Sequence, residues 1–178
     1  MEPLTALFVL IIVAFTVAAV YSDVRTRRIP NWLTVSALVL ALAVHGVVGG
    51  LGGLGFALAG FAVGFGILFV LWALGGGGGG DVKMMGALGA WLGLTMILQV
   101  FVVSAMVTVI LAFGRRVALY FSKRLEQREP RRFKDKAIEK RIETERKKNR
   151  WLVPYAVPLA LSTWIVLVAA WRSGTLPY

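Results

Sequence analysis

Two carboxylates stand apart from the other acidic residues of the chain. Of its nine Asp and Glu residues, six lie between residues 126 and 145, and one is Glu2. The remaining two, Asp23 and Asp81, each lie at the end of a long apolar stretch. A carboxylate at the centre of a bilayer costs about 2.5–3.5 kcal/mol even on lenient insertion scales. A pair beside apolar stretches therefore favours a functional interpretation.

Two carboxylates can hydrolyse a peptide bond when one of them is protonated and the other is ionised. The ionised group takes a proton from water, while the protonated group polarises the scissile carbonyl. Carboxylates a few ångströms apart share one proton, because like charges resist double ionisation. We therefore predict that Asp23 and Asp81 are the catalytic pair of an aspartic peptidase.

The residues around Asp81 could bind substrate or shape the site. Gly78, Gly79 and Gly80 precede it directly, and glycine permits positive φ angles and close approach of another chain. An extended substrate could pair with this backbone through main-chain hydrogen bonds; the alternative is a flexible linker. Lys83 could tune Asp81, or it could be an interfacial lysine whose ammonium reaches the lipid headgroups.

The composition indicates a membrane protein. The 178-residue chain is 58% hydrophobic, with a mean hydropathy of +0.75, which is too apolar for an ordinary soluble domain. The net charge is +11, but residues 114–150 contain 15 Lys and Arg against 6 acids. Such a cluster between membrane spans is typical of a cytoplasmic loop that attracts anionic lipid headgroups. We therefore expect lipid, and no nucleic acid, as its partner.

The residues offer little for binding a metal. The chain has no cysteine, which excludes disulfides and thiolate metal sites. The single histidine, His45, lies in an apolar stretch without metal-binding spacing, and we interpret it as a helix-end or interfacial residue. We predict no metal site and no cofactor.

Hydropathy predicts an all-α, polytopic membrane helical bundle with about six transmembrane helices. The predicted spans are residues 3–21, 32–48, 54–74, 83–95, 96–120 and 151–171. We predict two spans, not one, for residues 83–120 after Asp81. A single membrane-spanning helix there would leave the basic loop outside the cell. The chain thus divides into a membrane core, 1–120, with both aspartates, a basic cytoplasmic loop, 121–150, and 151–178 with the last span.

Charged residues predict which ends of the spans face the cytoplasm, and small residues predict where the helices pack closely. Arg25, Arg27 and Arg28 place the first connection in the cytoplasm, and the span count places Asp81 there as well. We therefore expect the active site at the cytoplasmic face of the inner membrane. The spacings Gly60-x-x-x-Gly64 and Gly89-x-x-x-Gly93 predict close helix packing.

The segments around the two aspartates resemble the paired motifs of type IV prepilin peptidases, membrane aspartic proteases of the GxGD class. The first segment is Asp23-x-Arg25-x-x-Arg28-Ile29-Pro30-Asn31, and the second is Gly78-Gly79-Gly80-Asp81-Val82-Lys83. Pro154-Tyr155-Ala156-x-Pro158 resembles the Pro-aromatic motif that opens the last span of that family. The resemblance implies that Asp23 and Asp81 are catalytic. It also implies that the substrate is a pilin or pseudopilin precursor, whose basic leader is cut at the cytoplasmic face.

Larger bifunctional members of that family carry an N-terminal cytoplasmic insert, often with four zinc-binding cysteines, and also N-methylate the new amine. This chain resembles the small forms without the insert, which are associated with tight-adherence pili, so we expect no methyltransferase activity. Two alternatives remain open. One is a small transporter or channel subunit, although transporter sites favour the bilayer midplane. The other is a non-enzymatic scaffold for pilus assembly. The bundle could also form a homodimer.

Overall fold

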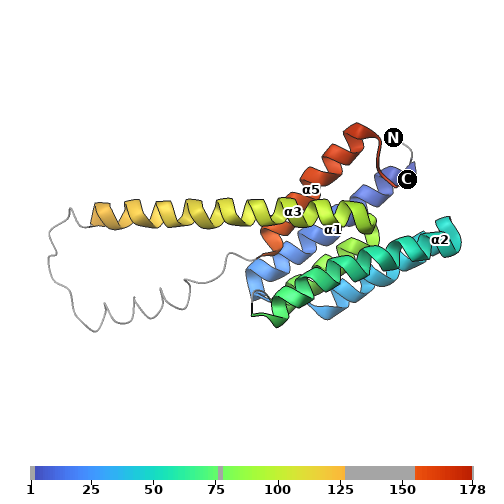
Figure 1. The fold of residues 1–178 in the computed structure, drawn as a ribbon, viewed down its shortest axis with the longest axis horizontal. Coiled ribbons are helices and arrows are strands. Elements are labelled where there is room, and N and C mark those ends of the chain that lie inside the picture. The colour runs from blue at the N-terminus through green and yellow to red at the C-terminus, as the bar shows by residue number, and fades with distance from the viewer. Residues whose placement is uncertain (1–2, 76–77, 127–154, 178) are drawn as a thin grey trace. The chain divides into compact units, whose positions relative to one another are not determined.

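The computed structural model describes residues 3–75, 78–126 and 155–177. The chain divides into two compact units, one formed by Met1–Met106 with Pro154–Tyr178 and the other by Val107–Val153. The described residues contain no strand and form α1 (Pro3–Thr26), α2 (Asn31–Ala73), α3 (Gly79–Glu126) and α5 (Ala156–Ser173), as Figure 1 shows. The predicted all-α fold is confirmed.

The described helices are long and apolar enough to cross a membrane. The candidate spans are Leu4–Thr26, Asn31–Ala73, Gly79–Ala118 and Ala156–Ser173. α2 has 43 residues and α3 has 48, whereas about 20 residues cover the hydrocarbon core. Length and composition therefore indicate a membrane protein. They do not confirm the six predicted crossings, which stay a prediction.

α2 is interrupted at Gly50, where φ is 58° and ψ is −140°. Glycine adopts such angles without the steric cost that a Cβ would add. The chain folds back across this break (Figure 1): a Cβ built on Gly53 would overlap the carbonyl of His45, and one on Gly46 would lie 3.2 Å from Leu54 Cδ2. Only Gly50 of the glycine-rich stretch around it leaves the helix.

α3 is interrupted at Gly93, where φ is 73° and ψ is 179°. Met85 and Ile97 lie on either side of this break and would be about 18 Å apart along a straight helix. A Cβ built on Gly64 would nevertheless meet both, at 2.5 Å from the Met85 carbonyl oxygen and 3.1 Å from Ile97 Cγ1. α3 therefore also folds back, two residues before the predicted end of the span at residue 95.

The two small-residue motifs pack against each other. A Cβ built on Gly60 would overlap the Gly89 carbonyl, and one built on Gly89 would overlap the Gly60 carbonyl. The backbones of α2 and α3 thus touch directly, which confirms the predicted close approach. This contact holds α3 against α2 a few turns from Asp81.

Trp91 and His45 lie in the core between α2 and α3. The Trp91 indole N–H donates to the Ala37 carbonyl at 2.9 Å, and His45 Nε2 donates to the Trp91 carbonyl at 3.2 Å. His45 is only 2% exposed, so its interpretation as an interfacial residue is wrong. Trp91 stands two residues before the break in α3, where carbonyls lose their helical partners. The buried imidazole N–H of His45 supplies a hydrogen-bond donor to the Trp91 carbonyl.

Candidate active site

Asp23 lies in the last turn of α1. The apolar stretch ends at Tyr21, but the helix continues to Thr26, so Asp23 lies within the helix and not after it as expected. Its main-chain carbonyl accepts the N–H of Arg27 at 2.8 Å. Arg27 has a φ of 55°, a left-handed conformation that commonly ends helices.

Local hydrogen bonds fix the turn that follows Asp23. The Ser22 hydroxyl donates to the Arg28 carbonyl at 2.9 Å, and the Thr26 hydroxyl donates to the Ser22 carbonyl at 2.8 Å and lies 3.1 Å from the Arg28 carbonyl oxygen. Ile29 is buried, with 6% exposure, and Pro30 caps the N-terminus of α2 with extended backbone angles. The chain is thereby anchored on both sides of the turn, which sets the position of Asp23.

Asp81 lies in the first turn of α3. The Gly78 carbonyl accepts the N–H groups of Asp81 and Val82, at 3.1 and 3.4 Å. In return, Gly78 N–H donates to Asp81 Oδ2 at 3.3 Å, as an acidic residue does in a capping box. A Cβ on Gly78 would lie 2.9 Å from Oδ2, so this arrangement depends on glycine.

The carboxylates of Asp23 and Asp81 lie close enough to interact electrostatically. Both side chains are half-buried. The Asp23 carboxylate also accepts a hydrogen bond from the main-chain N–H of Ala156, and the charge of Arg27 acts on it. The end of α1, the start of α3 and the start of α5 therefore meet at one site that contains two carboxylates.

Tyr155 lies at the same site, immediately before α5. Its hydroxyl is 3.0 Å from Ser104 Oγ. Burial raises the pKa of Tyr155, the hydrogen bond with Ser104 lowers it, and the negative charge of Asp81 raises it. The sequence signal for Tyr155 was its place in the Pro-aromatic motif. Ser104 lies in a featureless apolar run and was not predicted.

Comparisons with known proteins identify the family of this chain. The model of the type IV leader peptidase family matches residues 10–113, a stretch that includes both aspartates. This chain belongs to the type IV leader peptidase family. It is 32% identical over 116 residues to the prepilin leader peptidase/N-methyltransferase of Neisseria gonorrhoeae. It is 34% identical over 113 residues to the protein of the same name from Xanthomonas campestris pv. campestris.

These matches cover 61% and 57% of this family member but only 40% and 38% of the two relatives. The chain thus spans about two fifths of the length of the curated relatives it matches. No solved structure matches it.

The other predicted site residues of this leader peptidase family member, Gly79, Gly80 and Lys83, lie in α3 close to Asp81 in sequence. Gly79 and Gly80 form the first turn of α3. Among the described glycines of this segment, Gly75 and Gly78 to Gly80, only Gly75 has a positive φ angle. Lys83 Nζ donates to Asn31 Oδ1 at 2.8 Å. The Lys83 ammonium therefore connects the start of α3 to the start of α2.

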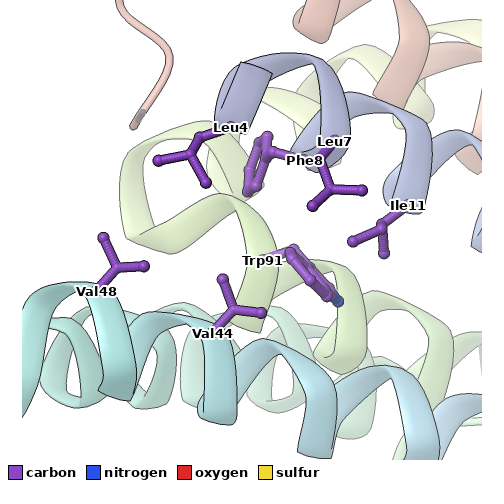
Figure 2. A pocket seen from close by; sticks show the side chains of 7 residues that line it. All are labelled: Leu4, Leu7, Phe8, Ile11, Val44, Val48 and Trp91. Carbon is purple, nitrogen blue, oxygen red and sulfur yellow. The ribbon is translucent and has the colours of Figure 1, made fainter. Parts of the chain in front are cut away.

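An apolar pocket of about 40 Å³ lies elsewhere in the protein (Figure 2). It is lined by Leu4, Leu7, Phe8, Ile11, Val44, Val48 and Trp91. Its lining residue nearest to Asp23 on α1 is Ile11, and twelve helical residues span about 18 Å. The pocket is therefore not part of the carboxylate site. No group of three or more His, Cys, Asp or Glu side chains lies together in the part of the chain that the structure describes.

Proposed function

We propose that this protein is a membrane aspartic endopeptidase that removes the basic leader from pilin or pseudopilin precursors. The observation that carries the proposal is the meeting of Asp23 and Asp81, from two different helices, at one half-buried site. Family membership supports it, as does the name prepilin leader peptidase of the two relatives.

In the proposed reaction, one carboxylate is ionised and the other holds the proton that the pair shares. The ionised group takes a proton from a water molecule, whose oxygen attacks the scissile carbonyl. The protonated group donates a hydrogen bond to that carbonyl as negative charge develops on it. The C–N bond then breaks, and the leaving amine takes the proton removed from water. The pair returns to its starting state with one proton.

The main chain before Asp81 supplies a place for the substrate backbone. Gly78 N–H is used by Asp81 Oδ2, whereas helix geometry gives the amides of Gly79 and Gly80 no intrahelical acceptor. We propose that these amides hold a substrate carbonyl beside the carboxylates. The role of Lys83 in this proposal is to keep the start of α3 in register with α2 through Asn31.

The proposed membrane topology has six crossings, with the active site at the cytoplasmic face of the inner membrane. The reversals at Gly50 and Gly93 support it. The first divides α2 into two segments of roughly span length, and the second divides α3 into a short segment before Gly93 and a longer one after it. Residues 127–150 of the basic loop lie outside the described residues, and we propose that anionic headgroups bind this loop. The proposal requires neither nucleic acid nor a second copy of the chain.

The test is cleavage of a precursor by the purified protein in anionic vesicles, with the products identified by mass spectrometry. We expect one cut, between the basic leader and the hydrophobic segment. The resemblance to type IV prepilin peptidases implies that the cut follows a glycine. A precursor in which this glycine is replaced by a bulky residue is therefore the matched control and should stay intact. If the normal precursor also stays intact, the protein is not a leader peptidase.

A further inference from the structure

Four aromatic side chains form a row along the second half of α2. They are Phe61, Phe65, Phe69 and Trp72. At about 100° per residue, their spacing places all four within about 80° of the helix circumference. Successive ring centroids lie 5.4, 5.6 and 5.6 Å apart, and the rings of the first two pairs are stacked. We call these four residues the aromatic row.

One end of the aromatic row lies beside the candidate active site. A Cβ built on Gly79 would lie 3.8 Å from Trp72 Nε1, and Gly79 stands two residues before Asp81 in the first turn of α3. Trp72 is 46% exposed and Phe69 is 43% exposed. The two rings nearest to Asp81 are therefore accessible to another molecule.

The other end of the aromatic row is held by α3. A Cβ built on Gly86 would lie 3.0 Å from Phe61 Cε2 and 3.1 Å from Phe65 Cβ, and both phenylalanines are half-buried. These two rings thus pack on the backbone of α3, which limits their reorientation. From Trp72 to Phe61 the helix advances about 16 Å, roughly half the thickness of the hydrocarbon core.

The place and direction of this surface indicate what covers it. In the proposed reaction the scissile bond lies at Asp23 and Asp81, and the hydrophobic segment of the precursor follows it. That segment needs an apolar surface that starts at the carboxylates and continues into the membrane, as the aromatic row does. Because lipid tails are as apolar as these rings, close packing has to retain a helix there. A row of rings held by α3 provides a surface of fixed shape for such packing.

We propose that the aromatic row is the docking surface for the hydrophobic segment of the precursor, which begins at Trp72 and runs toward Phe61. This inference rests on the proposed peptidase function. The row binds the part of the substrate that follows the cut, while the amides of Gly79 and Gly80 hold the backbone at the cut. The two contacts together fix the scissile bond from both sides.

Photo-crosslinking tests the docking directly. A benzophenone amino acid replaces Phe69 in the Asp23→Asn variant, which should leave the precursor uncut, and the sample is irradiated with the precursor in anionic vesicles. We expect an adduct with the hydrophobic segment, identified by mass spectrometry. Ile165, which lies on α5 and is 53% exposed, is the matched control position and should give no such adduct. Adducts of position 69 with lipid alone, or with a second copy of the chain alone, would overturn the docking.

Cleavage kinetics provide a second measurement. Phe69→Ala and Trp72→Ala should each raise KM about 3- to 10-fold with kcat within about twofold of wild type, because they remove aromatic contacts that ground state and transition state share. Trp171→Ala is the control, since Trp171 is also an exposed tryptophan, at 56%. It lies about 22 Å along α5 from Ala156 and should keep the wild-type KM.

Failure of the docking and failure of the peptidase function give different results. If the wild type cleaves the precursor, but Phe69→Ala and Trp72→Ala have the KM of Trp171→Ala, the docking surface is wrong and the peptidase function stands. An adduct at position 165 in place of position 69 has the same meaning. If the wild type does not cleave the precursor, the peptidase function is wrong and the docking proposal falls with it.

Discussion

The main-chain amide of Ala156 donates a hydrogen bond to the Asp23 carboxylate. This bond joins the first residue of α5 to the last turn of α1. A second link between the same helices is the Trp164 indole N–H, which donates to the Thr16 hydroxyl at 3.0 Å. α5 lies beyond the segment that the family model matches, residues 10–113, yet it orients one of the two acids. A carboxylate held in this way needs little reorganisation when substrate arrives.

Gly78→Ala should impair Asp81 selectively. The new Cβ would lie 2.9 Å from Asp81 Oδ2, so the carboxylate must move away and lose its bond to the residue 78 amide. We expect kcat to fall about tenfold or more, with a change in unfolding free energy below about 1 kcal/mol. Cleavage kinetics and thermal unfolding in detergent measure the two effects.

Gly114→Ala is the control for this variant. It lies on the same helix, and a Cβ there would meet nothing within 4 Å. It should cleave as the wild type does. Equal activities of Gly78→Ala and Gly114→Ala would show that the contact between residue 78 and Asp81 does not matter.

Gly60→Ala should destabilise the protein strongly. Its Cβ would overlap the main-chain carbonyl of Gly89, and backbone cannot move aside as a flexible side chain can. We expect a loss of about 3 kcal/mol in unfolding free energy, at the upper end of typical overpacking costs. Gly66→Ala, on the same helix with open space around its Cβ, should be neutral or slightly stabilising. Thermal unfolding that fails to separate the two variants would contradict the close packing of α2 on α3.

Lys83→Met and Asn31→Ala should each remove the same contact. The 2.8 Å hydrogen bond between these side chains is exposed, so each variant should lose about 1 kcal/mol or less. The double variant should lose no more than one single variant does. Additive losses in a denaturation series would mean that Lys83 and Asn31 act independently.

The sequence predicted those parts of the structure that depend on local pattern. Apolar runs predict helices, and Gly89 and Gly93 predict close packing. The basic loop, which has to lie in the cytoplasm, predicts a boundary between two spans at residues 95 and 96, close to the break at Gly93. The interactions of Ser104 and His45 were missed because their partners are distant in sequence and no periodicity marks them. The extension of α1 to Asp23 was also missed. The apolar run stops at Tyr21, whereas helical hydrogen bonding continues until the left-handed Arg27.

The stability of the protein should fall at alkaline pH partly because of Tyr155. Burial, opposed by the Ser104 hydrogen bond and reinforced by the Asp81 charge, raises the pKa of Tyr155, whereas the unfolded chain has the ordinary value of about 10. The group therefore contributes stability below pH 10, and this contribution is lost as the pH rises through the folded-state pKa. Melting temperatures measured from about pH 9 to 11 should fall more steeply for wild type than for Tyr155→Phe. Parallel curves would contradict a buried, protonated Tyr155.

The cleavage rate of a pilin precursor by Asp23→Asn, Asp81→Asn and the double variant is the most direct test of the carboxylate pair. Asn keeps the size of the side chain but cannot exchange a proton, and removal of one member of a catalytic unit costs nearly as much as removal of all. We predict that each single variant loses at least about 10³-fold in kcat, that the double variant is no slower than either, and that all three remain folded. Cleavage by either single variant at a rate near that of wild type would contradict the account.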